Sequence, residues 1–168
     1  MSPLVFGVDP GDVTGIAVYD LESGTVKAVD SLSFWAATAK LHREAPSVRA
    51  VVVEDPRQLG LYARHRSLGR EQRDRAARSI GQIDRDVVLW TELCRRLGLR
   101  CVCEAPQRRA KWSAGELAAV TGWTARTSEH GRDAARLAWE WAQTTRARSR
   151  GGEVPSCASG ATVATLRT

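Results

Sequence analysis

The first thirty residues contain three short segments rich in Val, Ile and Tyr, and this pattern predicts three β-strands. The segments are residues 4–9, 14–20 and 25–30. The turn sequences PGD and ESG separate them, and connections this short join antiparallel neighbours. We therefore expect the chain to begin with an antiparallel meander.

The next part of the chain changes from a helical pattern to a strand pattern. Residues 34–45 (FWAATAKLHREA) are typical of a helix. Residues 49–55 (RAVVVED) form a continuous apolar run, as in strands that are buried on both faces, and Pro56 ends this run. A basic segment over residues 57–78 follows, and we expect it to be a loop or lid.

A long helix is predicted over residues 79–97. Apolar residues recur there at spacings of three and four, which places them in one stripe, and Gly98 ends the helix. The stripe consists of Ile80, Ile83, Val87, Trp90, Cys94 and Leu97. Val88 and Leu89 lie off this stripe and require a second apolar neighbour.

The last third of the chain predicts one strand and two helices. The strand covers residues 99–105, a shorter helix covers residues 111–120, and a final helix runs from Ser128, a plausible N-cap, to about Arg146. The order of elements describes an α/β fold with a mixed five-stranded sheet flanked by helices.

The length of 168 residues fits one domain of ordinary size. We expect this domain to cover residues 1–148. Residues 149–168 are rich in Gly, Ser, Ala and Thr, and we expect a flexible C-terminal tail there.

Positive charge is concentrated in the basic segment. The formal net charge is +6, with 22 arginines and three lysines among the 25 basic residues. Residues 57–78 contain seven arginines against two acids, which gives a local surplus of five. Because the arginine fork matches phosphate oxygens, such a cluster indicates a phosphate-backbone binder. The alternative is an arginine-rich face that is simply solvated.

The composition also bears on the compartment. No apolar run approaches the ~18 residues that a membrane helix needs. The first eight residues lack the basic region and apolar stretch of a secretory signal, and the four cysteines have no metal-binding spacing. We expect a soluble cytoplasmic protein with no membrane partner.

Acidic residues end two of the apolar strands. Asp9 and Glu54 occupy these positions, and the ligands of open α/β sheets bind beyond the carboxyl ends of strands. His130 and Asp133 are three residues apart at the start of the final helix, on its apolar face, so both are expected to point toward the sheet.

Three acids and a histidine at one edge would repel each other unless cations lie among them, which predicts a Mg²⁺ or Mn²⁺ site. Two such ions ~3.5–4 Å apart clamp the attacking and leaving oxygens of a phosphodiester displacement. Each of these residues could instead have a purely structural role. Asp9 could cap a turn, Asp55 could be the acid instead of Glu54, Asp133 could stabilise the helix dipole, and His130 could be a core residue.

The sequences GVDPGDVTGIAV, VVVED and HGRDAARLA, in this order, resemble the RuvC-type Holliday junction resolvases of the RNase H-like superfamily, particularly the small versions that phages carry. The similarity covers roughly residues 4–145, including the long helix, the strand after it and the stretch APQRRAKW. It implies an RNase H-like fold and a homodimeric nuclease that nicks four-way DNA junctions with two divalent metal ions.

The resemblance also implies roles for individual residues. Asp9, Glu54, His130 and Asp133 match the ligand positions of the family, although many members have Asp where this chain has His130. Imidazole favours Mn²⁺ over Mg²⁺ more than a carboxylate does, so this difference bears on metal preference. Lys111 matches a basic position near the scissile phosphate, where a cation would offset developing charge.

Further residues are expected to contact branched DNA. Tyr62, the aromatic residue within the basic segment, matches a wedge that stacks at the junction centre, where each stacked base is worth ~1–3 kcal/mol. The expected contacts to the DNA backbone come from Arg57, Arg64, Arg66, Arg70, Arg73, Arg108, Arg109 and Lys111. The expected dimer contact is the helix of residues 79–97, which would place two sites on the two-fold axis of a junction.

Three other functions stay open. DPGDVTG also resembles the phosphate loop of actin-like and sugar-kinase ATPases, although those proteins need two such domains. An RNase H-like nuclease with another nucleic-acid substrate fits the same residues. A non-catalytic DNA-binding module is disfavoured, because binding alone does not require acids beside a phosphate path.

Overall fold

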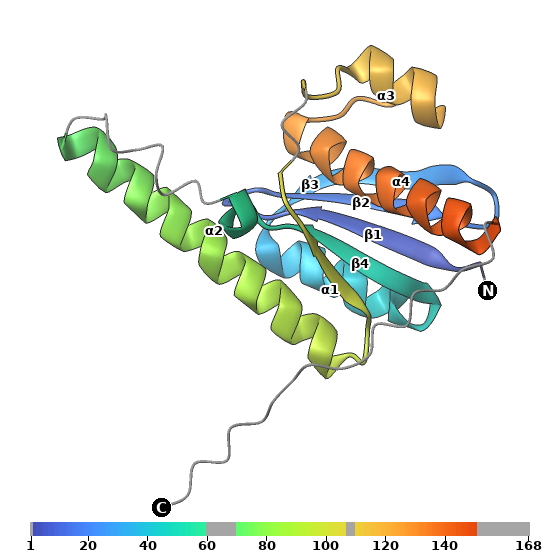
Figure 1. Ribbon diagram of the computed structural model, residues 1–168, viewed down its shortest axis with the longest axis horizontal. Helices are drawn as coiled ribbons and strands as arrows, with labels where there is room; N and C mark the ends of the chain where they lie inside the picture. Colours follow the sequence, from blue (N-terminus) through green and yellow to red (C-terminus); the bar gives the residue numbers. More distant parts are fainter. Residues whose placement is uncertain (1, 60–69, 107–109, 151–168) are drawn as a thin grey trace, which may run out of the picture.

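The computed structural model describes residues 2–59, 70–106 and 110–150 of the chain. Its centre is a five-stranded sheet in the order β3-β2-β1-β4-β5. Strands β1 (Leu4–Asp9), β2 (Thr14–Asp20) and β3 (Thr25–Leu32) form an antiparallel meander, which confirms the prediction. Strands β4 (Val48–Glu54) and β5 (Cys101–Glu104) are parallel to β1 (Figure 1). The predicted mixed α/β sheet is therefore correct.

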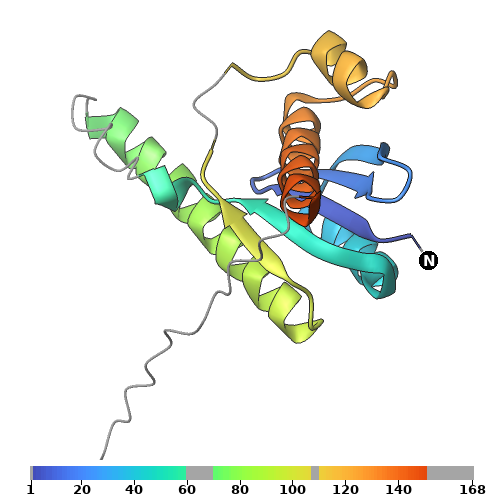
Figure 2. The same cartoon turned by 45° about the vertical axis from the view of Figure 1, so that its right-hand side comes forward.

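Helices cover both faces of this sheet. Helices α1 (Phe34–Glu44) and α2 (Arg70–Arg96) pack on one face, where Phe6, Val8 and Trp90 belong to the same buried cluster. Helix α4 (Glu129–Arg150) packs on the opposite face, against a second buried cluster. Helix α3 (Ala114–Thr121) contacts α4 and lies away from the sheet (Figure 2).

The N-terminal part of α2 corrects the prediction for the basic segment. We expected a loop or lid up to residue 78, but residues 70–78 are helical and continue directly into the predicted helix. The sequence REQRDRAAR consists mainly of good helix formers and contains neither Gly nor Pro. It has no apolar stripe, so a search for periodicity alone overlooks it. Residues 60–69 lie outside the described part of the chain.

The predicted start of the shorter helix, at Lys111, was also wrong. Helix α3 begins at Ala114 because Ser113 caps it. The Ser113 hydroxyl accepts a hydrogen bond from the Glu116 N–H at 3.2 Å, and the Glu116 carboxylate accepts one from the Ser113 N–H at 2.7 Å. Lys111 therefore lies in irregular backbone before the helix.

The C-terminal boundary differs slightly from the prediction. Helix α4 continues to Arg150, two residues beyond the predicted domain end, and the predicted tail from residue 151 lies outside the described residues. The division into one domain and a tail stays a prediction. No helix in the described ranges is long and apolar enough to cross a bilayer.

Candidate functional site

The alternation of side chains along β1 and β4 brings two acids to the same place. Val8 and Val53 are paired in the parallel register, so Asp9 and Glu54 follow side by side at the carboxyl ends of the two strands. Both carboxylates point to the face that α4 covers, because the preceding side chains of that face, Val5 and Val52, belong to the α4 cluster. Asp9 is buried, with 6% of its surface exposed.

Two glycines allow α4 to approach this face closely. A Cβ atom on Gly7 of β1 would lie 1.9 Å from the carbonyl oxygen of Ala134, and one on Gly15 of β2 would lie 2.1 Å from that of His130. Only glycine fits at such distances. The backbone of α4 therefore rests directly on the sheet, and its first turns lie over the end of β1.

The start of α4 is fixed by its predicted cap. The Ser128 hydroxyl accepts a hydrogen bond from the N–H of Gly131 at 3.0 Å, as expected of an N-cap. The first two turns then carry His130 and Asp133 on the side that faces Asp9. The sequence-based prediction that these residues share one face toward the sheet agrees with this arrangement.

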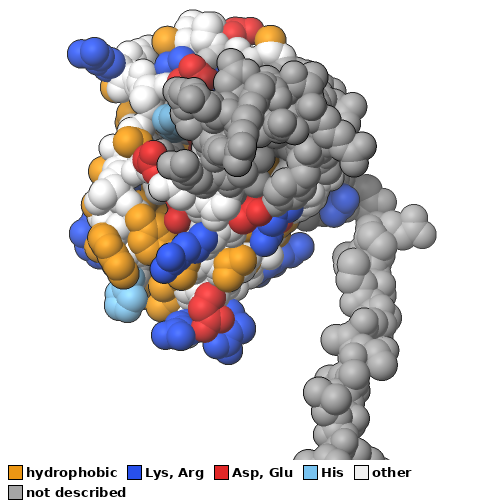
Figure 3. Space-filling view, turned by 90° about the vertical axis from the view of Figure 1, so that its left-hand side faces the viewer, with side chains coloured by type: hydrophobic (Ala, Val, Ile, Leu, Met, Phe, Trp, Pro, Cys, Tyr) orange, Lys and Arg blue, Asp and Glu red, His pale blue; other side chains and the backbone are white. Residues whose placement is uncertain are grey.

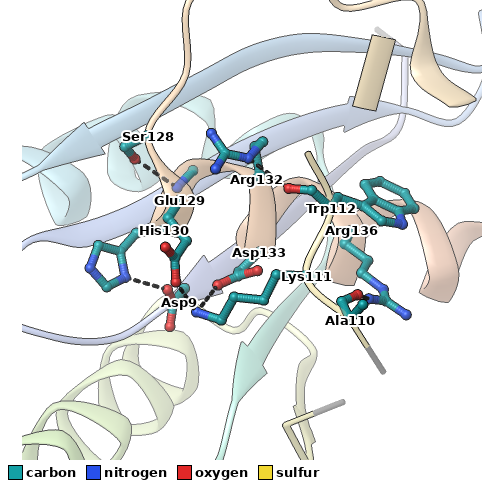
Figure 4. A network of polar contacts seen from close by, with 11 residues as sticks. Asp9, Ala110, Lys111, Trp112, Ser128, Glu129, His130, Arg132, Asp133 and Arg136 are labelled. Atoms are coloured by element: carbon teal, nitrogen blue, oxygen red, sulfur yellow. Dashed lines mark hydrogen bonds and ion pairs between the residues drawn. The ribbon is translucent and has the colours of Figure 1, made fainter. Parts of the chain in front are cut away.

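Side-chain contacts link the two strand ends to α4 (Figure 4). The His130 Nδ1 atom lies 2.7 Å from Oδ2 of Asp9. The Lys111 ammonium lies 2.9 Å from Oδ2 of Asp133 and also contacts the Glu129 carboxylate. A pocket of about 290 Å³ is lined by Asp9, Glu54, Lys111, His130 and Asp133, together with Pro10, Ile83, Pro106, Arg136 and Leu137. All four predicted ligands and Lys111 thus share one pocket.

The acids of the pocket shift each other's pKa values. Burial, followed by the negative charge of Asp9, raises the pKa of Glu54 to about 8. Burial also raises the pKa of Asp9, although its hydrogen bond with His130 acts in the opposite direction. A cation bound between the two groups would relieve the repulsion between their charged forms.

The donor types suit a hard divalent ion. Carboxylate oxygens are preferred by Mg²⁺, and a mixed set of oxygens and one imidazole also suits Mn²⁺. Asp133 already pairs with the Lys111 ammonium, which shows that this carboxylate attracts a cation. Within the described ranges, no group of three or more such side chains is close enough together to hold a metal ion as it stands. The ligand atoms are of the types that bind a divalent metal, but the side chains are not yet close enough together to coordinate one.

Asp55, the alternative to Glu54, has a different partner. Its carboxylate accepts hydrogen bonds from Nε and Nη2 of Arg57 at 2.7 and 2.8 Å, and it also accepts the backbone N–H of Arg57. These bonds lower the pKa of Asp55. Asp55 therefore stabilises the short turn after β4 and is absent from the pocket lining, whereas Glu54 is part of it.

Several predicted DNA contacts cannot be placed. The residues Tyr62, Arg64, Arg66, Arg108 and Arg109 lie outside the described residues, and Arg70 and Arg73 are described only as backbone of α2. Arg57 has its guanidinium bound to Asp55 and does not line the pocket. Among the described residues on the face shown in Figure 3, basic side chains are interspersed with acidic and apolar ones.

Three residues of α4 were not foreseen from the sequence. Glu129 contacts the Lys111 ammonium, and Arg132 and Arg136 bind backbone carbonyls on either side of Lys111. One signal was available for Arg136, since Glu140 lies four residues further along the helix and the pair falls next to the apolar stripe. The long-range partners have no local sequence signature.

Comparisons with known proteins place the fold. No protein-family model matches the chain, and no curated protein does. Among solved structures, the chain is similar to RuvC of T. thermophilus in complex with Holliday junction substrate, with a TM-score of 0.54 and 18% sequence identity. The match covers 87% of this chain and 96% of the other. The protein therefore has the RuvC-like, RNase H-like fold that the sequence motifs predicted.

Proposed function

We propose that this protein is a metal-dependent endonuclease that hydrolyses phosphodiester bonds in four-way (Holliday) or otherwise branched DNA. One observation carries the proposal. Asp9, Glu54, His130 and Asp133 converge in a single pocket at the carboxyl edge of a RuvC-like sheet. Three acids that meet in one pocket, with Asp9 buried and the other two partly buried, are costly to a fold, and a bound divalent metal would offset that cost.

The four side chains would hold Mg²⁺ or Mn²⁺, with two ions in each site. Ions bound there would clamp the attacking and leaving oxygens of the scissile phosphodiester. Asp9 and Glu54 come from rigid neighbouring strands, and Asp133 and His130 come from the capped start of α4. This origin on regular elements keeps the carboxylates at fixed mutual positions, as in-line displacement requires.

Lys111 would supply positive charge beside the scissile phosphate. Its ammonium lies at the mouth of the pocket, with 58% of the side chain exposed, and it contacts Asp133. Its acidic neighbours Glu129 and Asp133 raise its pKa, so it stays protonated at working pH. A protonated amine at this place offsets the charge that develops on the phosphate oxygens.

The basic segment would bind the phosphate backbone of the branched DNA. The local surplus of five positive charges within residues 57–78 supports this assignment, and the segment directly follows the strand that carries Glu54. Because the Arg57 guanidinium binds both oxygens of Asp55, the contacts fall to the other predicted residues of the segment, including Tyr62.

A homodimer through α2 would allow two sites to nick opposite strands. Val87, Trp90 and Cys94 are fully buried against the sheet, whereas Val88 and Leu89 are 52% and 37% exposed. The final helix does not cover these two side chains, because α4 lies on the opposite face of the sheet. A second copy of α2 is the partner that we propose for these two side chains.

The test compares substrates of one sequence. Four-way, nicked and fully duplex DNA, together with an RNA–DNA hybrid, are incubated with the protein in Mg²⁺, in Mn²⁺ and in chelator. We expect metal-dependent cleavage with preference for the four-way junction. Preferential cleavage of the hybrid would instead support the RNase H-like alternative, and no cleavage of any substrate in either metal would refute the proposal.

A further inference from the structure

We propose that Arg132 and Arg136 are positioning residues that fix Lys111 in the pocket by holding its backbone on both sides. The positioning follows from contacts within this chain. Its consequence for DNA cleavage rests on the proposed function. Figure 4 shows Arg132 and Arg136 on α4 beside the segment of Ala110, Lys111 and Trp112.

Arg132 holds the residue after Lys111. Its Nε atom donates a hydrogen bond of 2.7 Å to the carbonyl oxygen of Trp112, and its Nη1 atom donates one of 3.2 Å to the carbonyl of Thr127. The second bond ties the guanidinium to the segment just before α4. Arg132 therefore connects the Lys111 segment to the start of the helix that carries His130 and Asp133.

Arg136 holds the residue before Lys111. Its Nη1 atom donates a hydrogen bond of 2.9 Å to the carbonyl oxygen of Ala110, and its Nε atom donates one of 2.9 Å to Glu140. The guanidinium carbon also lies 5.6 Å from the centre of the Trp112 ring. Arg136 is only 7% exposed, and burying a charged group is costly unless it is paired and hydrogen-bonded. These partners therefore compensate the burial of the Arg136 guanidinium and fix its position.

The segment needs such support because it has no regular structure of its own. Residues 110–113 belong to neither a helix nor a strand, so the carbonyls of Ala110 and Trp112 have no partner in a helix or sheet ladder. A lysine on unsupported backbone would sample many positions. Charge-assisted bonds to the carbonyls on both sides restrict the backbone at Lys111 itself.

The arrangement also fixes the position of Lys111 relative to Asp133. Arg132 and Arg136 are one helical turn apart on α4, and Asp133 lies between them in the sequence. The same two turns therefore hold both the Lys111 backbone and the carboxylate that its ammonium contacts at 2.9 Å. Any small movement of α4 carries Lys111 with it.

The first test uses a lysine-specific endoproteinase on the native protein. The chain has only three lysines, Lys27 in β3, Lys40 in α1 and Lys111, so each cut is identified by fragment mass. We expect R132Q and R136Q, neither of which adds a lysine, to be cut after Lys111 about tenfold faster than the wild type, since cleavage follows the population of the open segment. Cleavage at the other two lysines should stay slow.

The matched control is R126Q, which removes an exposed arginine from the segment before α4 and should behave like the wild type. Equal acceleration at all three lysines in R132Q would mean that the arginine stabilises the whole fold, and it would overturn the positioning role. An unchanged rate at Lys111 in both variants would overturn it as well.

The second test reads the consequence for cleavage. R132Q should lower kcat with little change in KM, and in a K111Q background it should cause no further loss, because it acts through Lys111. Additive losses would contradict the proposal. If the wild type cuts no DNA, the proposed nuclease function fails, and the proteolysis result still decides whether the two arginines hold Lys111.

Discussion

The His130 imidazole and the Asp9 carboxylate are 2.7 Å apart, although 121 positions separate them in the sequence. Half of the His130 side chain is exposed, whereas 9% of the Asp9 side chain is. The alternative that His130 is a buried core residue is therefore wrong. His130 lines the pocket with half of its side chain open to solvent.

Replacing His130 by Asp should retain DNA cleavage and shift the metal preference toward Mg²⁺, because a carboxylate oxygen is a harder ligand than an imidazole nitrogen. The measurement is the ratio of cleavage rates in Mg²⁺ and in Mn²⁺. H42D, at an exposed histidine of α1, is the control and should leave the ratio unchanged. An identical ratio in H130D and the wild type would remove His130 from the site.

Replacing Gly7 by Ala should destabilise the protein by about 2 kcal/mol, as overpacking does in a core that cannot shift freely. The new Cβ would collide with the backbone of Ala134, so α4 must move away from the sheet and take Asp133 with it. Denaturant unfolding measures the loss, and cleavage should fall as well.

The control for this prediction is G81A on α2, where a new Cβ would meet nothing within 4 Å. Alanine is the better helix former, so this variant should be more stable than the wild type by about 0.5–1 kcal/mol. If G7A were as stable as G81A, the close approach of α4 to β1 would not be a requirement of the fold.

The strands and the acids of the pocket could be predicted from the sequence because both have local signatures. Strand alternation, short turns and an acid at the end of an apolar run located Asp9 and Glu54. The spacing of His130 and Asp133 placed them on one helix face. The order of the elements predicted a mixed sheet, and the structure adds that β1 and β4 are parallel neighbours.

The remaining features depend on contacts that no local pattern encodes. The extension of α2 back to Arg70 has helix-forming composition without an apolar stripe, so periodicity gave no signal. The partners of Arg132 and Arg136 lie 20 and 26 residues away in irregular backbone. Gly7 and Gly15 are required because the backbone of α4 crosses the sheet at these two positions. No local sequence pattern indicates where that crossing falls.

Asp20 should make folding stability depend on pH in the acid range. Hydrogen bonds, first from the Ser2 hydroxyl and also from the N–H groups of Glu22 and Ser23, lower its pKa from 3.8 to about 2. A lowered pKa in the folded state contributes stability above pH 3.8, and this contribution is lost as the pH falls toward 2.

D20N should therefore be less stable than the wild type at neutral pH, and the difference should narrow between pH 4 and pH 2, as followed by thermal unfolding. D12N, at an exposed carboxylate in the turn after β1, is the comparison and should show little difference at neutral pH. A gap between D20N and the wild type that stays constant down to pH 2 would contradict this account.

A charge at Val88 should disrupt the proposed dimer. The wild type, with a subunit mass of 18.4 kDa, should sediment at micromolar concentration as a species of twice that mass, and V88E should sediment as the monomer. V120E, which places the same charge on a similarly exposed valine of α3, should leave the dimer intact. A monomeric wild type that nicks both strands in one binding event would refute the dimer.

The metal site is the central claim, and D9N tests it most directly. Asn keeps the shape of the side chain and removes the charge, so the measurement is cleavage of a four-way junction in Mn²⁺ beside junction binding in chelator. D9N should lose cleavage by about 10²-fold or more and bind the junction as tightly as the wild type or more tightly, because less negative charge faces the phosphates. D30N, which removes a carboxylate that pairs with Lys40 outside the pocket, should cleave normally. Full metal-dependent cleavage by D9N would contradict the account.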